Sequence, residues 1–213
     1  MTELTPWTIA SSEDMTPEDS GERQLQREIG STKRADRFYD RQMLDSLNET
    51  MINLIRQQEM FFMATADASG NCDCSPRFGE PGFVHVIDPT TLAYPDYRGN
   101  GVFASLGNIM ENPHIGMVFL DFFNSTVGLH VNGEAKIFPN GDVPPGIAPP
   151  LLQIAAEDSR LIERWVVITV EEAYIHCSKH VPRLQKMQKK IDWGTDDTVA
   201  KSDNYFVGQG ETQ

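Results

Sequence analysis

A series of short, strand-like apolar segments between residues 60 and 178 constrains the fold more than any other feature of this sequence. The first, "MFFMATAD" at 60–67, is rich in aromatic residues and runs into the polar turn Ala-Ser-Gly-Asn. Parallel strands need long crossover connections, whereas most of the links here are short turns. The pattern therefore predicts an antiparallel barrel or sandwich of six strands. The other five segments are 82–88, 91–94, 114–122, 126–138 and 164–178.

Helices are predicted to flank these strands. Apolar residues between positions 44 and 55 recur at the spacing of one helical face, so we interpret 36–58 as one or two amphipathic helices. Another helix is predicted over 101–113, where Pro113 prevents it from continuing, and a further one over about 149–163. The expected fold class is mainly β with flanking helices.

The charge of the chain limits its partners. Eighteen Lys and Arg residues against 31 Asp and Glu residues give a formal net charge of -13, which repels a polyphosphate backbone, so we expect no nucleic-acid partner. No apolar run approaches the roughly 18 to 20 residues of a membrane-spanning helix, so we expect no membrane partner. Three cysteines and an N-terminus without a signal-peptide pattern favour a cytoplasmic location.

The stretch "YPDYRGNGV" at 94–102 is the first candidate binding feature. Glycines let the backbone N–H groups approach a ligand, and the start of the following helix carries partial positive charge. Arg98 could add charge-assisted hydrogen bonds to an anion such as a phosphate, with Ser105 and Asn108 as further donors. A glycine-rich turn with a solvated arginine explains the same residues equally well.

A second candidate is Arg77, in the stretch "CSPRFGEPGF" at 74–83. Its proline and glycine neighbours predict an irregular backbone that holds the charge near the sheet, where it could approach the same anion as Arg98. An arginine in an ordinary hairpin loop is the alternative.

Metal sites and common hydrolytic motifs have weak support. Cys72-x-Cys74 and His176-Cys177-x-x-His180 contain ligand-type residues, but their spacings differ from those of structural zinc sites, so we predict no metal site. Gly-x-Ser-x-Gly, His-Glu-x-x-His and the P-loop motif do not occur in the sequence.

The order of these segments resembles the pyridoxamine 5'-phosphate oxidase-like flavin-binding proteins, in particular a branch of predicted flavin-nucleotide-binding proteins. The resemblance covers about residues 50–180, and "PDYRGNG…SLGNI" is its most specific part. It implies a split β-barrel that binds FMN, and a homodimer with two flavin sites across the subunit interface.

The resemblance also implies which residues contact the cofactor. Arg77 corresponds to a strand arginine that reaches the flavin phosphate or the ring edge, and His130 and Asn132 to contacts from the second subunit. The full set of implied cofactor-binding residues is Arg77, Tyr94, Pro95, Asp96, Arg98, Asn100, Ser105, Asn108, His130 and Asn132.

The sequence departs from the oxidase proper in two places. The turn reads Arg-Gly-Asn instead of Ser-Arg-Lys, and the C-terminal region lacks the arginine-tryptophan signature for the vitamin substrate. We therefore expect an FMN-dependent oxidoreductase that acts on another small molecule, with a nicotinamide or organic electron donor, and not a true pyridoxamine phosphate oxidase. The alternative is a non-catalytic protein that binds or senses flavin, deazaflavin or haem. No side chain is assigned as a catalytic acid or base.

Three regions are expected along the chain. They are an acidic, partly flexible N-terminal arm over 1–35, the FMN-binding split-barrel domain with its leading helices over 36–180, and a C-terminal tail over 181–213.

Overall fold

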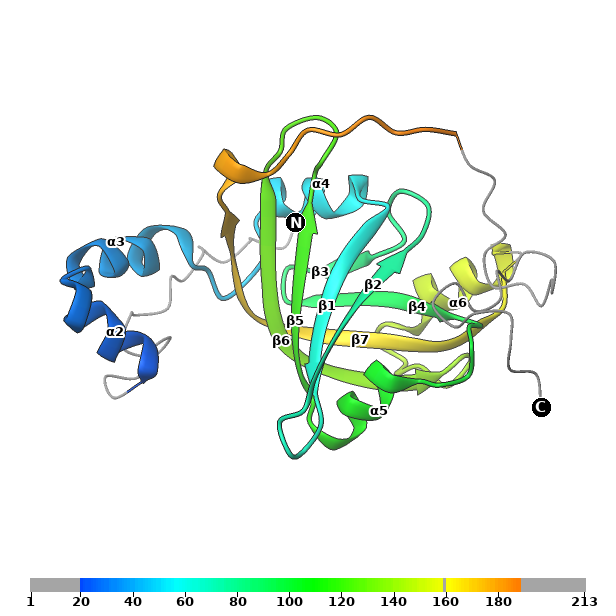
Figure 1. Cartoon of the computed structure of the whole chain (residues 1–213). Coiled ribbons are helices and arrows are strands. Elements are labelled where there is room, and N and C mark those ends of the chain that lie inside the picture. Colours follow the sequence, from blue (N-terminus) through cyan, green and yellow to red (C-terminus); the bar gives the residue numbers. More distant parts are fainter. Residues whose placement is uncertain (1–19, 159, 189–213) are drawn as a thin grey trace, which may run out of the picture.

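A strongly curved antiparallel sheet of seven strands forms the centre of the structure (Figure 1). The structure is a computed structural model and describes residues 20–158 and 160–188. The strand order is β2-β1-β5-β6-β7-β4-β3, and every pairing is antiparallel. The strands are β1 Met60–Ala66, β2 Cys72–Phe78, β3 His85–Asp88, β4 Thr91–Tyr97, β5 His114–Leu120, β6 Gly128–Pro139 and β7 Ile162–His176.

The antiparallel, mainly β architecture is confirmed, but the prediction of a six-stranded barrel is wrong in strand number and in closure. The additional strand is β2, and the sheet stays unclosed because, within the described residues, its end strands β2 and β3 do not pair with each other. The strand β2 was not predicted because its polar residues and Pro76 have low strand propensity. Since β2 is an edge strand that pairs only with β1, proline is tolerated in it.

Helices flank the sheet as expected. The helix α4 Glu49–Gln57 lies within the predicted region 36–58, and α3 Thr32–Gln42 overlaps it but begins earlier, at Thr32. The helix α2 Gly21–Ile29 was not predicted. Figure 1 shows α2 and α3 projecting to one side of the sheet, while α4 lies over one end of it. The helix α5 Ala104–Glu111 follows the turn after β4, and α6 Ala148–Glu157 is shorter than expected because β7 begins at Ile162. A short 3-10 helix, Ser178–His180, follows β7.

Aromatic side chains fill the core between the curved sheet and α4. Phe61 stacks on Phe83 with ring centroids 5.7 Å apart and meets the edge of Tyr94 at 5.1 Å. Phe61 and Tyr94 are fully buried. Burial of a large apolar side chain stabilises a fold by about 1.5 to 3 kcal/mol, so these contacts fix β4 firmly against β1. Because Tyr94 is held in the core, the end of β4 that follows it is also held in a fixed position.

The two ends of the chain are described only in part. The acidic arm and the C-terminal tail lie largely outside the described residues, which begin at position 20 and end at position 188. None of the helices in the described part of the chain is both long and apolar enough to cross a membrane.

Candidate functional site

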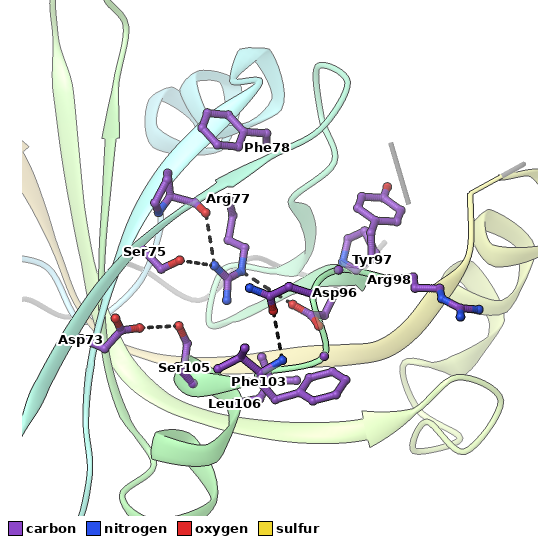
Figure 2. A pocket seen from close by; sticks show the side chains of 17 residues that line it. Asp73, Ser75, Arg77, Phe78, Asp96, Tyr97, Arg98, Phe103, Ser105 and Leu106 are labelled. Atoms are coloured by element: carbon purple, nitrogen blue, oxygen red, sulfur yellow. Dashed lines mark hydrogen bonds and ion pairs between the residues drawn. The ribbon is translucent and has the colours of Figure 1, made fainter. Parts of the chain in front are cut away.

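A cavity of about 460 Å³ lies between β2, the end of β4 and the beginning of α5 (Figure 2). Its size is within the usual range for small-molecule sites. Four of the described residues that line it carry a charge. They are Asp73 and Arg77 on β2, Asp96 on β4 and Arg98 in the turn that follows.

One face of β2 supplies the wall of the cavity. Exposure alternates along this strand, and Asp73, Ser75 and Arg77 share the half-buried face because successive side chains point to opposite sides. Arg77 Nη1 donates to Ser75 Oγ at 2.6 Å and to the carbonyl oxygen of Pro76 at 3.2 Å. These two bonds hold the guanidinium over the cavity, as Figure 2 shows.

Arg77 also forms an ion pair with Asp96. The distance from Arg77 Nε to Asp96 Oδ1 is 3.7 Å, and both side chains are largely buried. Burial raises the pKa of Asp96, and the nearby Arg77 charge opposes this rise. Arg77 Nε is itself buried and has no hydrogen-bond acceptor. Because Arg77 lines the cavity, its charged guanidinium would stabilise an anionic ligand there.

The turn before α5 brings backbone N–H groups to the cavity. Gly101 has φ 78°, which glycine adopts without strain, and Asn100 Oδ1 accepts from the Val102 N–H at 3.0 Å. No side chain caps the first residue of α5, because the capping position is occupied by Phe103. The first turn of a helix without a cap has N–H groups available to an anion.

Asp73 contacts the same helix end. Its Oδ2 accepts from Ser105 Oγ at 2.7 Å, and Ser105, the second residue of α5, is 4% exposed. A carboxylate near a helix N-terminus interacts favourably with the helix dipole. The structure thus has a negative side chain where an anionic ligand was expected.

Arg98 does not share the arrangement of Arg77. Its backbone N–H donates to Leu161 O at 2.9 Å, which anchors the turn to the residue before β7. In Figure 2 its side chain points away from Arg77 and Asp96. Arg98 lies at the edge of the cavity, and Arg77 is the arginine at its centre.

The cavity brings together six of the ten residues that the sequence singled out. These six are Arg77, Pro95, Asp96, Arg98, Asn100 and Ser105.

Two of the remaining four residues are engaged inside the protein. Tyr94 is fully buried, burial raises its pKa, and its hydroxyl contacts Met63 Sδ at 3.1 Å. Asn108 Nδ2 donates to Thr65 Oγ1 at 3.1 Å, which ties α5 to β1. Neither residue lines the cavity.

The other two belong to a polar row on β6 and β7, which comprises His130, Asn132, Glu172, Tyr174 and His176. His130 Nε2 lies 2.9 Å from His176 Nδ1, and the His130 ring stacks on Tyr174 with centroids 4.7 Å apart. Asn132 Nδ2 donates to Glu172 Oε2 at 3.0 Å. Burial, together with His176, lowers the pKa of His130. These side chains already have partners within the chain.

Sequence reasoning missed several residues that line the cavity, among them Asp73, Ser75, Phe78, Tyr97 and Phe103. The signal for two of them was present in "CDCSPRF". Had this stretch been interpreted as a strand, its period of two would have placed Asp73 and Ser75 on the same face as Arg77. For Phe103, which has φ 53°, the sequence offers no comparable signal.

The family model described as "Pyridoxamine 5'-phosphate oxidase" matches residues 47–177, more than half of the chain. None of the curated proteins matches the sequence.

Among solved structures, HupZ of Group A Streptococcus is similar, with 20% identity and a TM-score of 0.49 over 65% of this chain and 99% of that chain. HutZ of Vibrio cholerae, described as a heme storage protein, has 14% identity and a TM-score of 0.42 over 60% and 93% of the two chains. A structure described as an F420 reductase has 16% identity and a TM-score of 0.39 over 61% and 98%. Similarity at this level does not extend to a ligand or an activity.

Proposed function

The chain belongs to the pyridoxamine 5'-phosphate oxidase family, and from this premise we propose that it binds FMN in the Arg77 cavity and acts as an FMN-dependent oxidoreductase on a small molecule. The observation that carries the proposal is the Arg77 guanidinium, which is fixed by Ser75 and lines the cavity beside the uncapped first turn of α5. A phosphate of the cofactor would bind to this guanidinium, with further donors from the first turn of α5.

The lining of the cavity suits a flavin nucleotide better than haem. Haem iron is ligated by His, Cys, Met or Tyr side chains. Of the described residues that line the cavity, none is His, Cys or Met, and the hydroxyl of its one tyrosine, Tyr97, already donates to Asp158 at 3.1 Å. An arginine on a rigid strand and an uncapped helix end are instead the usual partners of a phosphate.

Several residues of the cavity have a defined part in this proposal. FMN, when bound, supplies the hydride-transfer chemistry, and the protein supplies position and electrostatics. Arg77 binds the anionic end of the cofactor, and Asp96 and Ser75 hold the Arg77 guanidinium in place. The apolar side chain of Phe103, at the start of α5, would exclude water from a bound ligand.

The other expected residues serve the site indirectly or from a second subunit. We assign Tyr94 and Asn108 to positioning, because they hold β4 and α5 next to the cavity. In the proposed homodimer, His130 and Asn132 of the second subunit approach the flavin. Sedimentation of the full chain at micromolar concentration tests this arrangement, since a monomer that still binds FMN would contradict it.

The test of the proposed function is the visible spectrum of the purified full-length chain, followed by titration with FMN. We expect flavin absorption bands, mass identification of FMN after denaturation, and bleaching of the flavin by a reduced nicotinamide. Protein that is colourless and takes up no added FMN would contradict the proposal. Tight binding without electron transfer would favour the non-catalytic alternative, and a haem spectrum would replace flavin with haem as the ligand.

A further inference from the structure

The contact between Asp73 and Ser105 is unexpected in a site for a phosphate. The Ser105 hydroxyl is one of the donors expected to reach the anion, but it donates to Asp73 Oδ2 at 2.7 Å. Ser105 is almost fully buried, so its hydroxyl has little access to another acceptor while Asp73 holds it. Two negative groups cannot share this position without strong repulsion.

The charged side chains that line the cavity already balance one another. Arg77 lies on the same face of β2 as Asp73, and Asp96 faces the cavity from β4. Arg98 lies at the edge of the cavity, and α5 contributes its N-terminal N–H groups. Arg77 already forms an ion pair with Asp96, with 3.7 Å between Arg77 Nε and Asp96 Oδ1. The two arginines and two aspartates that line the cavity have opposite formal charges that cancel, so a phosphate adds an excess of negative charge.

We propose that Asp73 is a built-in competitor of the cofactor phosphate and sets how strongly the site discriminates phosphorylated from unphosphorylated ligands. Its carboxylate occupies the position at the start of α5 that a phosphate would take, and the phosphate has to displace it from Ser105. The inference rests on the proposed function, since it assigns a role to one residue of the same site. No covalent step is involved.

The test compares Asp73→Asn with the unmodified full-length chain. Asparagine keeps the size of the side chain and an oxygen that can accept from Ser105, but it removes the negative charge. Asp142→Asn, at an exposed carboxylate outside the cavity, is the matched control for a change of one charge. Dissociation constants are measured for FMN and for riboflavin, which lacks the phosphate.

We expect Asp73→Asn to bind FMN at least about tenfold more tightly, because removing one of two like charges that approach each other relieves repulsion. Riboflavin affinity should change by less than about threefold in the same variant, and Asp142→Asn should change neither. Equal changes for FMN and riboflavin, or weaker binding of both, would overturn the inference, since Asp73 would then contact a part that the two ligands share.

A second probe separates this inference from the proposed function. Inorganic phosphate should raise the melting temperature of Asp73→Asn more than that of the unmodified chain, and sodium chloride at matched ionic strength should not. If the unmodified chain binds no FMN, the proposed function fails while the phosphate experiment still decides the role of Asp73. If FMN binds but neither FMN nor phosphate distinguishes the variant, only the role of Asp73 fails.

Discussion

The Arg77 cavity and the polar row on β6 and β7 both contain polar side chains but differ in how these are paired. In the row, His130 contacts His176 and Tyr174, and Asn132 donates to Glu172. In the cavity, Arg77 Nε has no acceptor and the first turn of α5 has no side-chain cap. Both regions contain residues that the sequence assigned to the cofactor.

This difference indicates in which region a ligand would be bound most favourably. A polar group that already has a hydrogen-bond partner must give it up before it can bind something else, whereas the uncapped N–H groups at the start of α5 have no side-chain partner to give up. We therefore expect changes in the row to affect mainly the fold and the proposed subunit contact, and changes in the cavity to affect mainly ligand affinity.

The largest expected effect is on stability and concerns Gly133, next to Asn132 in the row. The register between β6 and β7 shifts at this point, and a Cβ on Gly133 would lie 2.0 Å from the carbonyl oxygen of Thr169. Because backbone must move to relieve this overlap, we expect Gly133→Ala to lower the free energy of unfolding by about 3 kcal/mol or more. Urea denaturation measures the loss.

Gly107→Ala is the matched control for that variant. Gly107 lies within α5, and a Cβ there meets nothing within 4 Å. Alanine favours a helix over glycine by about 0.5 to 1 kcal/mol, so this variant should be slightly more stable. Equal destabilisation by both substitutions would show that the β6–β7 pairing is not the tighter of the two regions.

The next effect is on ligand affinity and concerns Arg77. We expect Arg77→Ala to weaken FMN binding by about 10- to 100-fold, since a hydrogen bond to a charged group contributes about 1.5 to 3 kcal/mol. Arg56→Ala, at an exposed arginine of α4 outside the cavity, is the control and should leave affinity unchanged. Fluorescence titration measures both. Similar FMN affinities for the two variants would show that Arg77 does not contribute to FMN binding.

The pH dependence of stability should report on the row. The pKa of His130 lies below its ordinary value because of burial and the neighbouring His176. Near and below pH 6.5 the unfolded chain therefore binds more protons than the folded chain, and the stability present at higher pH is lost as the pH falls.

Melting temperatures between pH 7.5 and 5 measure this loss. In His130→Phe, which keeps an aromatic ring against Tyr174, the loss should be smaller. It should not vanish, because burial also lowers the pKa of His85. An unchanged pH dependence of the melting temperature in His130→Phe would show that protonation of His130 does not contribute to the loss of stability.

The smallest expected effect concerns Arg98. Its side chain points away from Arg77 and Asp96, so we expect Arg98→Ala to weaken FMN binding by only about threefold, a value typical of an exposed charge. A loss as large as that of Arg77→Ala would mean that the Arg98 side chain turns into the cavity when the ligand binds.

The sequence was sufficient for the family and for the antiparallel sheet, and it singled out Arg77, Asp96 and Ser105, which the structure brings to one cavity. It could not show how far along each strand the core extends. Tyr94 and Asp96 share one face of β4, but only Asp96 lies close enough to the strand end to reach the cavity. That distinction depends on tertiary packing against Phe61, which no local pattern contains.

Two other differences have equally specific causes. The extra strand was missed because Pro76 and its polar neighbours have low strand propensity, and pairing with β1 at the edge of the sheet overrides this propensity. The turn that carries Arg98 is anchored by the bond from the Arg98 backbone N–H to Leu161, a residue 63 positions further along the chain. Such long-range contacts are not encoded in the turn itself.

The most direct test of the central claim is a crystal structure of the full-length chain with FMN. We expect the phosphate to lie within hydrogen-bonding distance of Arg77 and next to the first turn of α5, with Asp73 no longer bonded to Ser105. FMN bound at the polar row of the same chain, with the Arg77 cavity unchanged, would contradict the account.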